Sequence, residues 1–206
     1  MQNKFSAIIF DYGGVIEISG VKLISGITGI LGVSKEEWRL KYLNYNHLTN
    51  VENRAWSDVA LLVARDFTDD TEKLEKLARF FDEGGKSKKL NSELIDMIEK
   101  LKASGFKTAI LSNYTTTLRD RVKNQNIDHL FDEVVVSGEE GYQKPDKEIF
   151  EITFNKLGVK SSEAIFVDDS ESSLSSYGEV GYTPILYTDN ESLRIRLSEL
   201  LNISLS

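Results

Sequence analysis

The sequence predicts a doubly wound α/β fold with a parallel sheet and an inserted all-helical domain. Two observations carry this prediction. Short apolar runs of strand length alternate with helical patterns over most of the chain, and one long segment near the N-terminus shows helical patterns alone. With 206 residues, of which 40% are hydrophobic, the chain can bury one substantial core and a small second domain.

Five short apolar runs are expected to form the strands. The first, residues 6–10, is rich in Ile and Phe and ends at an Asp and a Gly pair, as a buried parallel strand does. The other four lie at residues 108–111, 133–136, 164–167 and 183–187. Because helical patterns separate these runs, the sheet should be parallel, and ligands should bind at the carboxyl ends of its strands.

Three helical patterns lie between the later strands, at residues 92–103, 117–124 and 145–157. The last of them has Pro145 at its expected first turn and Gly158 as its stop. Strand and helix therefore alternate through the whole second half of the chain.

The segment from residue 17 to residue 86 interrupts the alternation, because it shows no β-branched run bounded by turns. Ser34 and Glu37 form the capping-box pattern that opens a helix. Apolar residues at helical spacing predict two more helices: Val59, Leu62, Val63 and Phe67, then Leu74, Leu77, Ala78 and Phe81. Ordinary packing between helices explains these stripes better than a cofactor site. The expected domains are a core of residues 1–16 and 87–206 and a helical cap of residues 17–86.

The composition excludes several kinds of site and partner. The chain has no cysteine for a disulfide, a thiolate metal site or a nucleophile, and His47 and His129 are too few for a multi-histidine metal site. A net charge of -8 argues against nucleic-acid binding and favours a small substrate. No apolar stretch is long enough for a membrane span or a secretion signal, so we expect a cytoplasmic protein without membrane contacts.

Polar segments follow the first two core strands at their carboxyl ends. Asp11 comes directly after the first strand, and Gly13 and Gly14 let the backbone come close to a ligand. Ser112 and Asn113 follow the second strand, where a small hydroxyl and an amide can donate hydrogen bonds to phosphate oxygens. An aspartate in the first position can attack a substrate or bind a metal ion.

Two further polar segments follow later in the chain. Lys144 stands directly before the predicted helix at residues 145–157, where its charge and the helix dipole favour an anion. Asp168 and Asp169 follow an apolar strand, where paired carboxylates need a compensating cation such as Mg²⁺. Each segment alone is explained as well by a helix cap, a turn or a solvated charge. Their occurrence together predicts a site for phosphate and magnesium.

The ordered segments FDYGGV, LSN, YQKPD and FVDDS resemble the four motifs of the haloacid dehalogenase-like hydrolases. The match spans almost the whole chain, and the helical insert is similar to the cap that this superfamily carries between its first and second motifs. The resemblance implies a Rossmann-like core, Mg²⁺ as cofactor and hydrolysis of a small phosphorylated metabolite.

The resemblance also implies roles for individual residues. Asp11 would be the nucleophile that forms an aspartyl-phosphate and would bind Mg²⁺ through its other oxygen. The backbone carbonyl of Gly13 and the carboxylate of Asp169 would also bind the metal, with Asp168 as a near neighbour. The phosphoryl group would be held by Gly13, Gly14, Ser112, Asn113 and Lys144, of which Lys144 also neutralises the nucleophile.

One position departs from the pattern of the phosphatases in this family. They usually carry a second Asp two residues after the nucleophile as general acid and base, and here this residue is Gly13. Loss of a placed acid or base lowers rates by about 10² to 10⁴. The sequence resembles an FDxGxV subgroup that is classed with sugar-phosphate phosphatases, and this favours small sugar phosphates, among them 1-phosphates. The hypothesis for the missing acid is Glu17, a cap residue or a chain of water molecules.

Two other functions remain open on the sequence. A 2-haloacid dehalogenase would use Asp11 without a metal, although the paired Asp168 and Asp169 argue against it. A phosphate-binding or regulatory protein with little turnover would explain Gly13. Substrate identity should depend on the cap, where the candidate residues are Tyr45, His47, Arg54 and Trp56.

Overall fold

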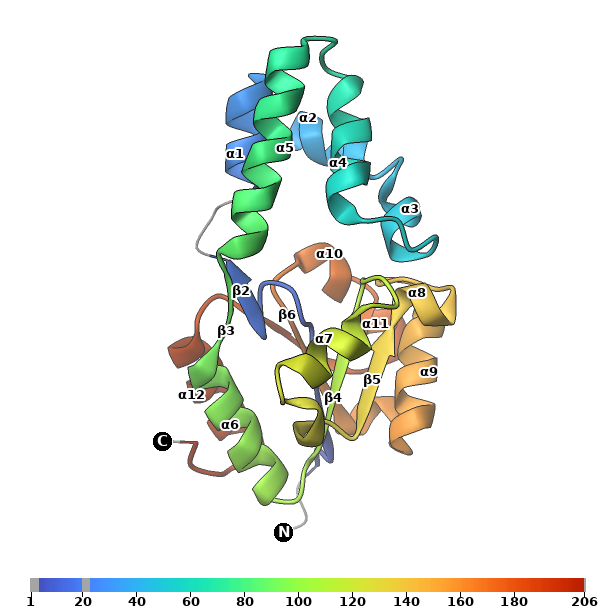
Figure 1. The fold of residues 1–206 in the computed structure, drawn as a ribbon. Helices are drawn as coiled ribbons and strands as arrows, with labels where there is room; N and C mark the ends of the chain where they lie inside the picture. Colours follow the sequence, from blue (N-terminus) through green and yellow to red (C-terminus); the bar gives the residue numbers. More distant parts are fainter. Residues whose placement is uncertain (1–3, 20–22, 206) are drawn as a thin grey trace.

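The computed structural model describes residues 4–19 and 23–205 and confirms the predicted α/β fold (Figure 1). Five parallel strands form one sheet in the order β5-β4-β1-β6-β7. Their bounds are β1 Ala7–Phe10, β4 Lys107–Ser112, β5 Glu133–Val136, β6 Ala164–Asp168 and β7 Thr183–Leu186. Each lies within one residue of the predicted bounds, because strands buried on both faces are continuous apolar runs.

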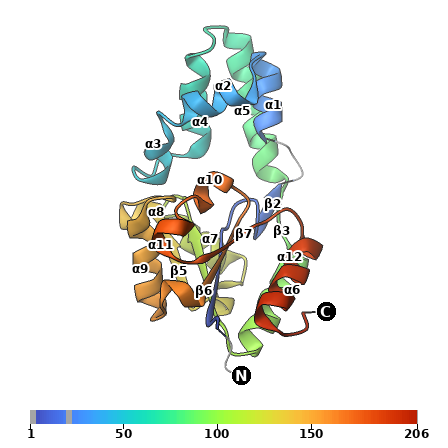
Figure 2. The ribbon, with the colours of Figure 1, turned by 180° about the vertical axis from the view of Figure 1, so that it is seen from behind.

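Helices cover both faces of this sheet, as the two opposite views in Figures 1 and 2 show. Alternate residues of β1 point to opposite faces: Ile8 and Phe10 belong to one apolar cluster, whereas Ala7 and Ile9 belong to the other. The first cluster is covered by α6 Ser92–Ala103, α7 Leu118–Asn124 and α12 Asn190–Leu201. The second is covered mainly by α9 Lys147–Leu157, with α10 Glu171–Leu174 and α11 Tyr177–Val180 beside it. Short α8, η1 and η2 span Ser137–Glu140, Asp128–Leu130 and Ser161–Glu163.

The start of α9 differs from the prediction. The helix begins at Lys147, so the expectation that Pro145 lies in its first turn is wrong. The residues before the helix form a turn of their own, in which the Asp146 backbone N–H donates to the Gln143 carbonyl at 2.7 Å. The Asp146 carboxylate accepts from the Gln143 backbone N–H at 3.1 Å, and the Lys144–Pro145 peptide is cis.

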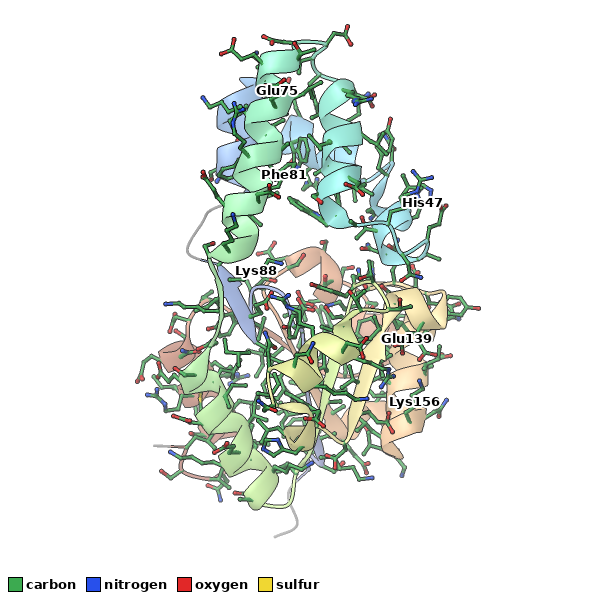
Figure 3. The ribbon with its side chains drawn as sticks, viewed as in Figure 1. His47, Glu75, Phe81, Lys88, Glu139 and Lys156 are labelled. Carbon is green, nitrogen blue, oxygen red and sulfur yellow. The ribbon has the colours of Figure 1, made fainter. Side chains whose placement is uncertain are left out.

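Five helices form a separate layer above the carboxyl ends of the strands (Figure 1). They are α1 Leu23–Leu31, α2 Lys35–Tyr42, α3 Asn46–Asn50, α4 Trp56–Arg65 and α5 Thr71–Lys86. They pack around their own apolar cluster, in which Phe81 lies between α4 and α5 (Figure 3). The predicted capping box is confirmed, since the Ser34 hydroxyl accepts from the Glu37 backbone and the Glu37 carboxylate accepts from the Ser34 backbone. Within the two described ranges, no helix has the length and apolar character needed to cross a bilayer.

A short antiparallel ribbon connects the two layers. Its strands are β2 Glu17–Ser19 and β3 Lys88–Leu90, so the expectation that residues 17–86 contain helices alone is wrong. The ribbon was not predicted, because its strands are three residues long and contain charged side chains, so neither strand forms an apolar run in the sequence. Because the ribbon pairs residues assigned to the cap with residues assigned to the core, the domain boundaries at residues 16/17 and 86/87 stay a prediction.

Candidate active site

The sheet order brings three predicted site residues together. β1 is the central strand, with β4 on one side and β6 on the other. Asp11 follows β1 directly, and its backbone N–H donates to the Val167 carbonyl at 2.8 Å. Ser112 ends β4 and Asp168 ends β6. Since parallel strands end at the same edge of a sheet, these residues meet at one place.

Lys144 joins the two buried carboxylates of this edge. Its Nζ lies 2.9 Å from Asp11 Oδ1 and 2.5 Å from Asp168 Oδ2. The Ser112 hydroxyl also donates to Asp11 Oδ1, at 2.8 Å. All four side chains are buried, with at most 8% of each residue exposed. A buried ammonium group is costly unless carboxylates compensate it, so this arrangement fixes both the lysine and the nucleophile candidate.

Asn113 holds the backbone of Lys144. Its side-chain oxygen accepts from the Lys144 backbone N–H at 2.7 Å, and its side-chain nitrogen donates to the Lys144 carbonyl at 3.0 Å. The sequence pattern predicts Asn113 as a phosphate ligand through its amide. In the structure, the side-chain amide is engaged in positioning Lys144.

Three carboxylates cluster at the open side of this group. One oxygen each of Asp11, Asp168 and Asp169 lies within 4.8 Å of the other two. Asp11 and Asp168 are buried, whereas Asp169 is exposed. With one ammonium group against three carboxylates, the cluster carries an excess of negative charge.

This excess is visible in the pKa values. Desolvation by the surrounding protein and the charges of Asp11 and Asp168 together raise the pKa of Asp169 to about 6, although the side chain remains open to solvent. Burial also raises the pKa of Asp168, against the opposing effect of Lys144. Burial alone would lower the pKa of Lys144, but the carboxylates of Asp11 and Asp168 outweigh it and raise the pKa.

The two glycines after Asp11 differ in what they permit. Gly14 has φ +87°, and a Cβ on it would lie 2.3 Å from Asp169 Oδ2, so only glycine leaves room for Asp169. Gly13 is exposed, and a Cβ there would meet no atom of the described residues within 4 Å. Gly13 is also absent from the residues with positive φ in the described chain, so its backbone does not require glycine.

Glu17, the residue proposed for the missing acid, is held in a buried network. Its Oε1 lies 2.5 Å from Arg121 Nη2 and accepts from the Tyr12 hydroxyl at 3.0 Å, while Oε2 lies 3.5 Å from Lys88 Nζ. Gln125 donates to the same Oε1 at 3.1 Å. Burial raises the pKa of Tyr12, and the charge of Glu17 adds to this effect. These contacts support a structural role for Glu17, between the ribbon and α7.

Three of the four cap candidates make contacts inside the cap. Tyr45 donates its hydroxyl to Asp66 at 2.8 Å, and the Trp56 ring lies edge-on to Phe81 at 5.3 Å between centroids. His47 lies 3.6 Å from Glu52, with about half of both side chains exposed, on the outer part of α3 (Figure 3). The side chain of Arg54 lies on the surface.

Two asparagines that no sequence pattern singles out connect the cap to the core. Asn50 Nδ2 donates to Gln143 Oε1 at 2.7 Å, next to Lys144. Asn53 accepts from the Thr116 backbone N–H at 2.8 Å and donates to the Gly138 carbonyl at 3.0 Å. The contacts join loops that are distant in the sequence, and amides in loops carry no local signal for such contacts.

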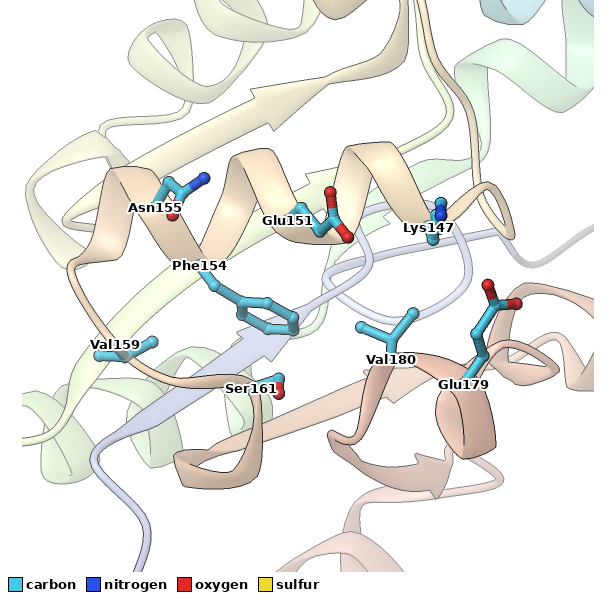
Figure 4. A pocket seen from close by; sticks show the side chains of 8 residues that line it. All are labelled: Lys147, Glu151, Phe154, Asn155, Val159, Ser161, Glu179 and Val180. Carbon is cyan, nitrogen blue, oxygen red and sulfur yellow. The ribbon is translucent and has the colours of Figure 1, made fainter.

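A hollow on the flank of the core is separate from this group. It has a volume of about 470 Å³ and lies between α9, the segment after it and α11 (Figure 4). Lys147, Glu151 and Glu179 give it mixed charges around the edge of the Phe154 ring. None of the residues grouped around Asp11 lines it.

Comparisons with known proteins identify the family of this chain. The family model of haloacid dehalogenase-like hydrolases matches residues 5–175. Over 77 residues, the chain is 36% identical to a glyceraldehyde 3-phosphate phosphatase of Methanothermobacter thermautotrophicus, a match that covers 37% of this chain and 32% of that protein. Over 91 residues, it is 30% identical to (S)-2-haloacid dehalogenase 4A of Burkholderia cepacia, with 44% of this chain and 39% of that protein covered. The chain thus spans well under half the length of these curated relatives.

A solved structure shows the same fold over the whole chain. It is described as a predicted HAD-like family hydrolase from Porphyromonas gingivalis and superposes with a TM-score of 0.65. The superposition covers 98% of this chain and 100% of that chain at 18% sequence identity, which supports the shared fold alone.

Proposed function

Because the chain belongs to the haloacid dehalogenase-like hydrolases, we propose that it is a phosphatase that hydrolyses a small phosphomonoester through an aspartyl-phosphate on Asp11. The observation that carries this proposal is the cluster of Asp11, Asp168 and Asp169 around buried Lys144. A phosphate dianion and a carboxylate nucleophile repel each other, so phosphoryl transfer needs concentrated positive charge. Lys144 supplies one positive charge, and the carboxylates would bind a metal cation that supplies more. A haloacid has a single negative charge and needs no metal-binding cluster of carboxylates.

The proposed reaction has two displacements. In the first, a carboxylate oxygen of Asp11 forms a bond to phosphorus while the bond from phosphorus to the alcohol oxygen breaks, and the departing oxygen takes up a proton from solvent. In the second, water attacks the phosphorus and gives up a proton to solvent, while the bond from phosphorus to the Asp11 oxygen breaks and releases phosphate and the free carboxylate. Lys144 and Ser112 hold Asp11 Oδ1 and thereby fix the orientation of the nucleophile throughout.

The residues present fit a magnesium ion. Mg²⁺ prefers oxygen ligands, and the carboxylate cluster carries an excess of negative charge. Desolvation and then the charges of Asp11 and Asp168 raise the pKa of Asp169 to about 6. We propose that Asp11, Asp169 and the Gly13 carbonyl hold the ion, with Asp168 beside it and paired to Lys144. When bound, Mg²⁺ neutralises charge on the phosphate and the nucleophile.

The proposed substrate is a small phosphorylated metabolite, with sugar phosphates as the first class to test. The phosphatase among the relatives acts, by its name, on glyceraldehyde 3-phosphate. Gly13 provides no side chain to protonate the leaving group, which favours substrates whose leaving group needs little help, such as sugar 1-phosphates. The dehalogenase among the relatives keeps carbon–halogen cleavage as the second candidate.

A phosphate-release screen tests the proposal. Sugar phosphates, nucleotides and phosphorylated cofactor precursors are incubated with the protein and Mg²⁺, beside Asp11→Asn and beside excess EDTA. We expect phosphate release that both Asp11→Asn and EDTA abolish. Halide release from 2-haloacids in the presence of EDTA would instead identify a dehalogenase, and phosphate release that survives Asp11→Asn would contradict the mechanism. A stable phosphorylated Asp11 without phosphate release would identify a binding protein.

A further inference from the structure

The cap meets the loop that carries Lys144 through a pair of amide side chains. Asn50 is the last residue of α3 and is 8% exposed. Its side-chain nitrogen donates to the side-chain oxygen of Gln143 at 2.7 Å. Helix α3 also lies against α8, so this corner of the cap rests directly on the core (Figure 1).

Hydrogen bonds hold the segments on both sides of this pair. On the core side, Asp146 accepts from the Gln143 backbone N–H at 3.1 Å, and the Asn113 side chain binds the backbone of Lys144 on both sides. On the cap side, Asn53 binds two backbone groups of the core. The amide pair therefore has a fixed place relative to Lys144 and, through it, to Asp11.

The leaving group should project toward the cap, to which Asn50 belongs. In phosphoryl transfer, the attacking and leaving oxygens lie roughly in line with the phosphorus. The attacking oxygen belongs to Asp11 at the end of β1, with the sheet behind it. The alcohol part of the ester must then point away from the sheet, toward the cap helices that lie above this edge (Figure 1).

The pair retains hydrogen-bonding capacity that suits a hydroxyl group. Among the described residues, the side chains of Asn50 and Gln143 take part in the one hydrogen bond that joins them, which leaves one amide oxygen and the remaining amide N–H groups for a ligand. The same set remains if both amides are turned by 180°. A hydroxyl group both donates and accepts, so it can bind to both amides at once.

We propose that Asn50 and Gln143 determine specificity by binding a hydroxyl group on the alcohol part of the substrate. This inference rests on the proposed phosphatase function, and it selects phosphate esters of polyhydroxy compounds over esters of apolar alcohols. A site built to bind a hydroxyl leaves polar groups unpaired when the hydroxyl is missing, which penalises the analogue.

Matched ligands test this proposal. The Asp11→Asn protein with Mg²⁺ is titrated calorimetrically with two pairs, glycerol 1-phosphate against propyl phosphate and glucose 1-phosphate against cyclohexyl phosphate. We expect at least one hydroxylated ligand to bind about tenfold more tightly than its partner. The variants Asn50→Leu and Gln143→Leu, made in the same background, should reduce this ratio to about one.

Asn53→Ala is the control for a role that consists only of holding the cap. It removes two cap–core hydrogen bonds without touching the amide pair. We expect it to weaken both ligands of a pair equally and to keep their ratio. If Asn50→Leu and Gln143→Leu also weaken both ligands equally, or if neither pair shows a preference in the parent protein, the proposal is wrong.

Hydrolysis of p-nitrophenyl phosphate by the Asp11-containing protein is measured in parallel. Hydroxyl preference without Asp11-dependent turnover would overturn the phosphatase proposal and keep the binding role of the pair. Asp11-dependent turnover without hydroxyl preference would support the phosphatase proposal and overturn the binding role of the pair.

Discussion

The open space at Gly13 allows the missing acid to be restored. A Cβ at this position would meet no described atom within 4 Å, and the backbone lies outside the left-handed region, so Gly13→Asp should fold without strain. Desolvation and then the charges of Asp11 and Asp168 raise the pKa of Asp169 to about 6, and the same two charges would raise the pKa of an introduced Asp. Part of the new side chain would then be protonated near neutral pH and able to donate to a leaving alkoxide.

The expected gain depends on the leaving group. A placed general acid contributes about 10² to 10⁴ in rate, so hydrolysis of an alkyl phosphate such as glycerol 1-phosphate should rise by about 10² or more. Hydrolysis of p-nitrophenyl phosphate should rise by less than about tenfold, because a phenolate of low basicity leaves without a proton. The assay is phosphate release under saturating Mg²⁺ at several pH values.

Gly13→Asn is the matched control, because it adds the same volume without an acidic proton. Equal rates for Gly13→Asp and Gly13→Asn on the alkyl ester would refute the reasoning. Such a result would mean that position 13 does not face the leaving group, or that another group already protonates it.

Three further predictions concern charge. Lys144→Met should lower the free energy of unfolding by about 3–5 kcal/mol, measured by urea denaturation, because it leaves two buried carboxylates without their cation. Glu17→Gln should lower stability by about 1–3 kcal/mol and leave the pH profile of kcat unchanged, since the carboxylate serves the buried network around Arg121. In the metal-free protein, the contribution of Asp169 to stability should be lost as the pH rises from about 4 to about 6, because the pKa of Asp169 is about 6 in the folded state and has an ordinary value of 3.8. Saturating Mg²⁺ should reverse this dependence in thermal unfolding.

Each of these three has an outcome that contradicts it. Lys147→Met, at an exposed position three residues later, is the control for Lys144 and should change stability by less than about 0.5 kcal/mol. A pH profile that loses its acidic limb in Glu17→Gln would restore Glu17 as the acid. Without metal, the same dependence of thermal stability on pH between 4 and 6 in Asp169→Asn and in the parent protein would mean that Asp169 has an ordinary pKa.

The strands and the main site residues were predictable because their signals are local. A strand buried on both faces requires a continuous apolar run, and Asp11 and Asp168 stand out as carboxylates at the ends of such runs. Parallel pairing then brings these ends together without further information. The start of α9 was predicted less well, because the Asp146 carboxylate caps a turn with Gln143 and delays the helix by two residues.

The cap–core contacts were not predictable, since they depend on polar side chains that are distant in the sequence. Asn50 and Gln143 are 93 residues apart, and Glu17 and Arg121 are 104 residues apart. Asn and Gln in loops usually bind water or their own backbone, so nothing local marks the few that connect two layers. The contact of Glu17 with Arg121 on α7 was not predictable for the same reason, and the hypothesis that Glu17 is the acid stays a prediction.

The three carboxylates of the site differ in burial and in their contact with Lys144, and this difference predicts how the protein responds to removal of the metal ion. Asp11 and Asp168 are buried and both contact Lys144, whose ammonium group offsets part of their charge without a metal ion. Asp169 is exposed, and it is the carboxylate whose charge a bound Mg²⁺ would have to balance. Excess EDTA should therefore abolish phosphate release while far-UV circular dichroism stays unchanged, and added Mg²⁺ should restore activity within the mixing time. Unfolding on chelation at neutral pH would show instead that the metal, and not Lys144, holds the ends of β1 and β6 together.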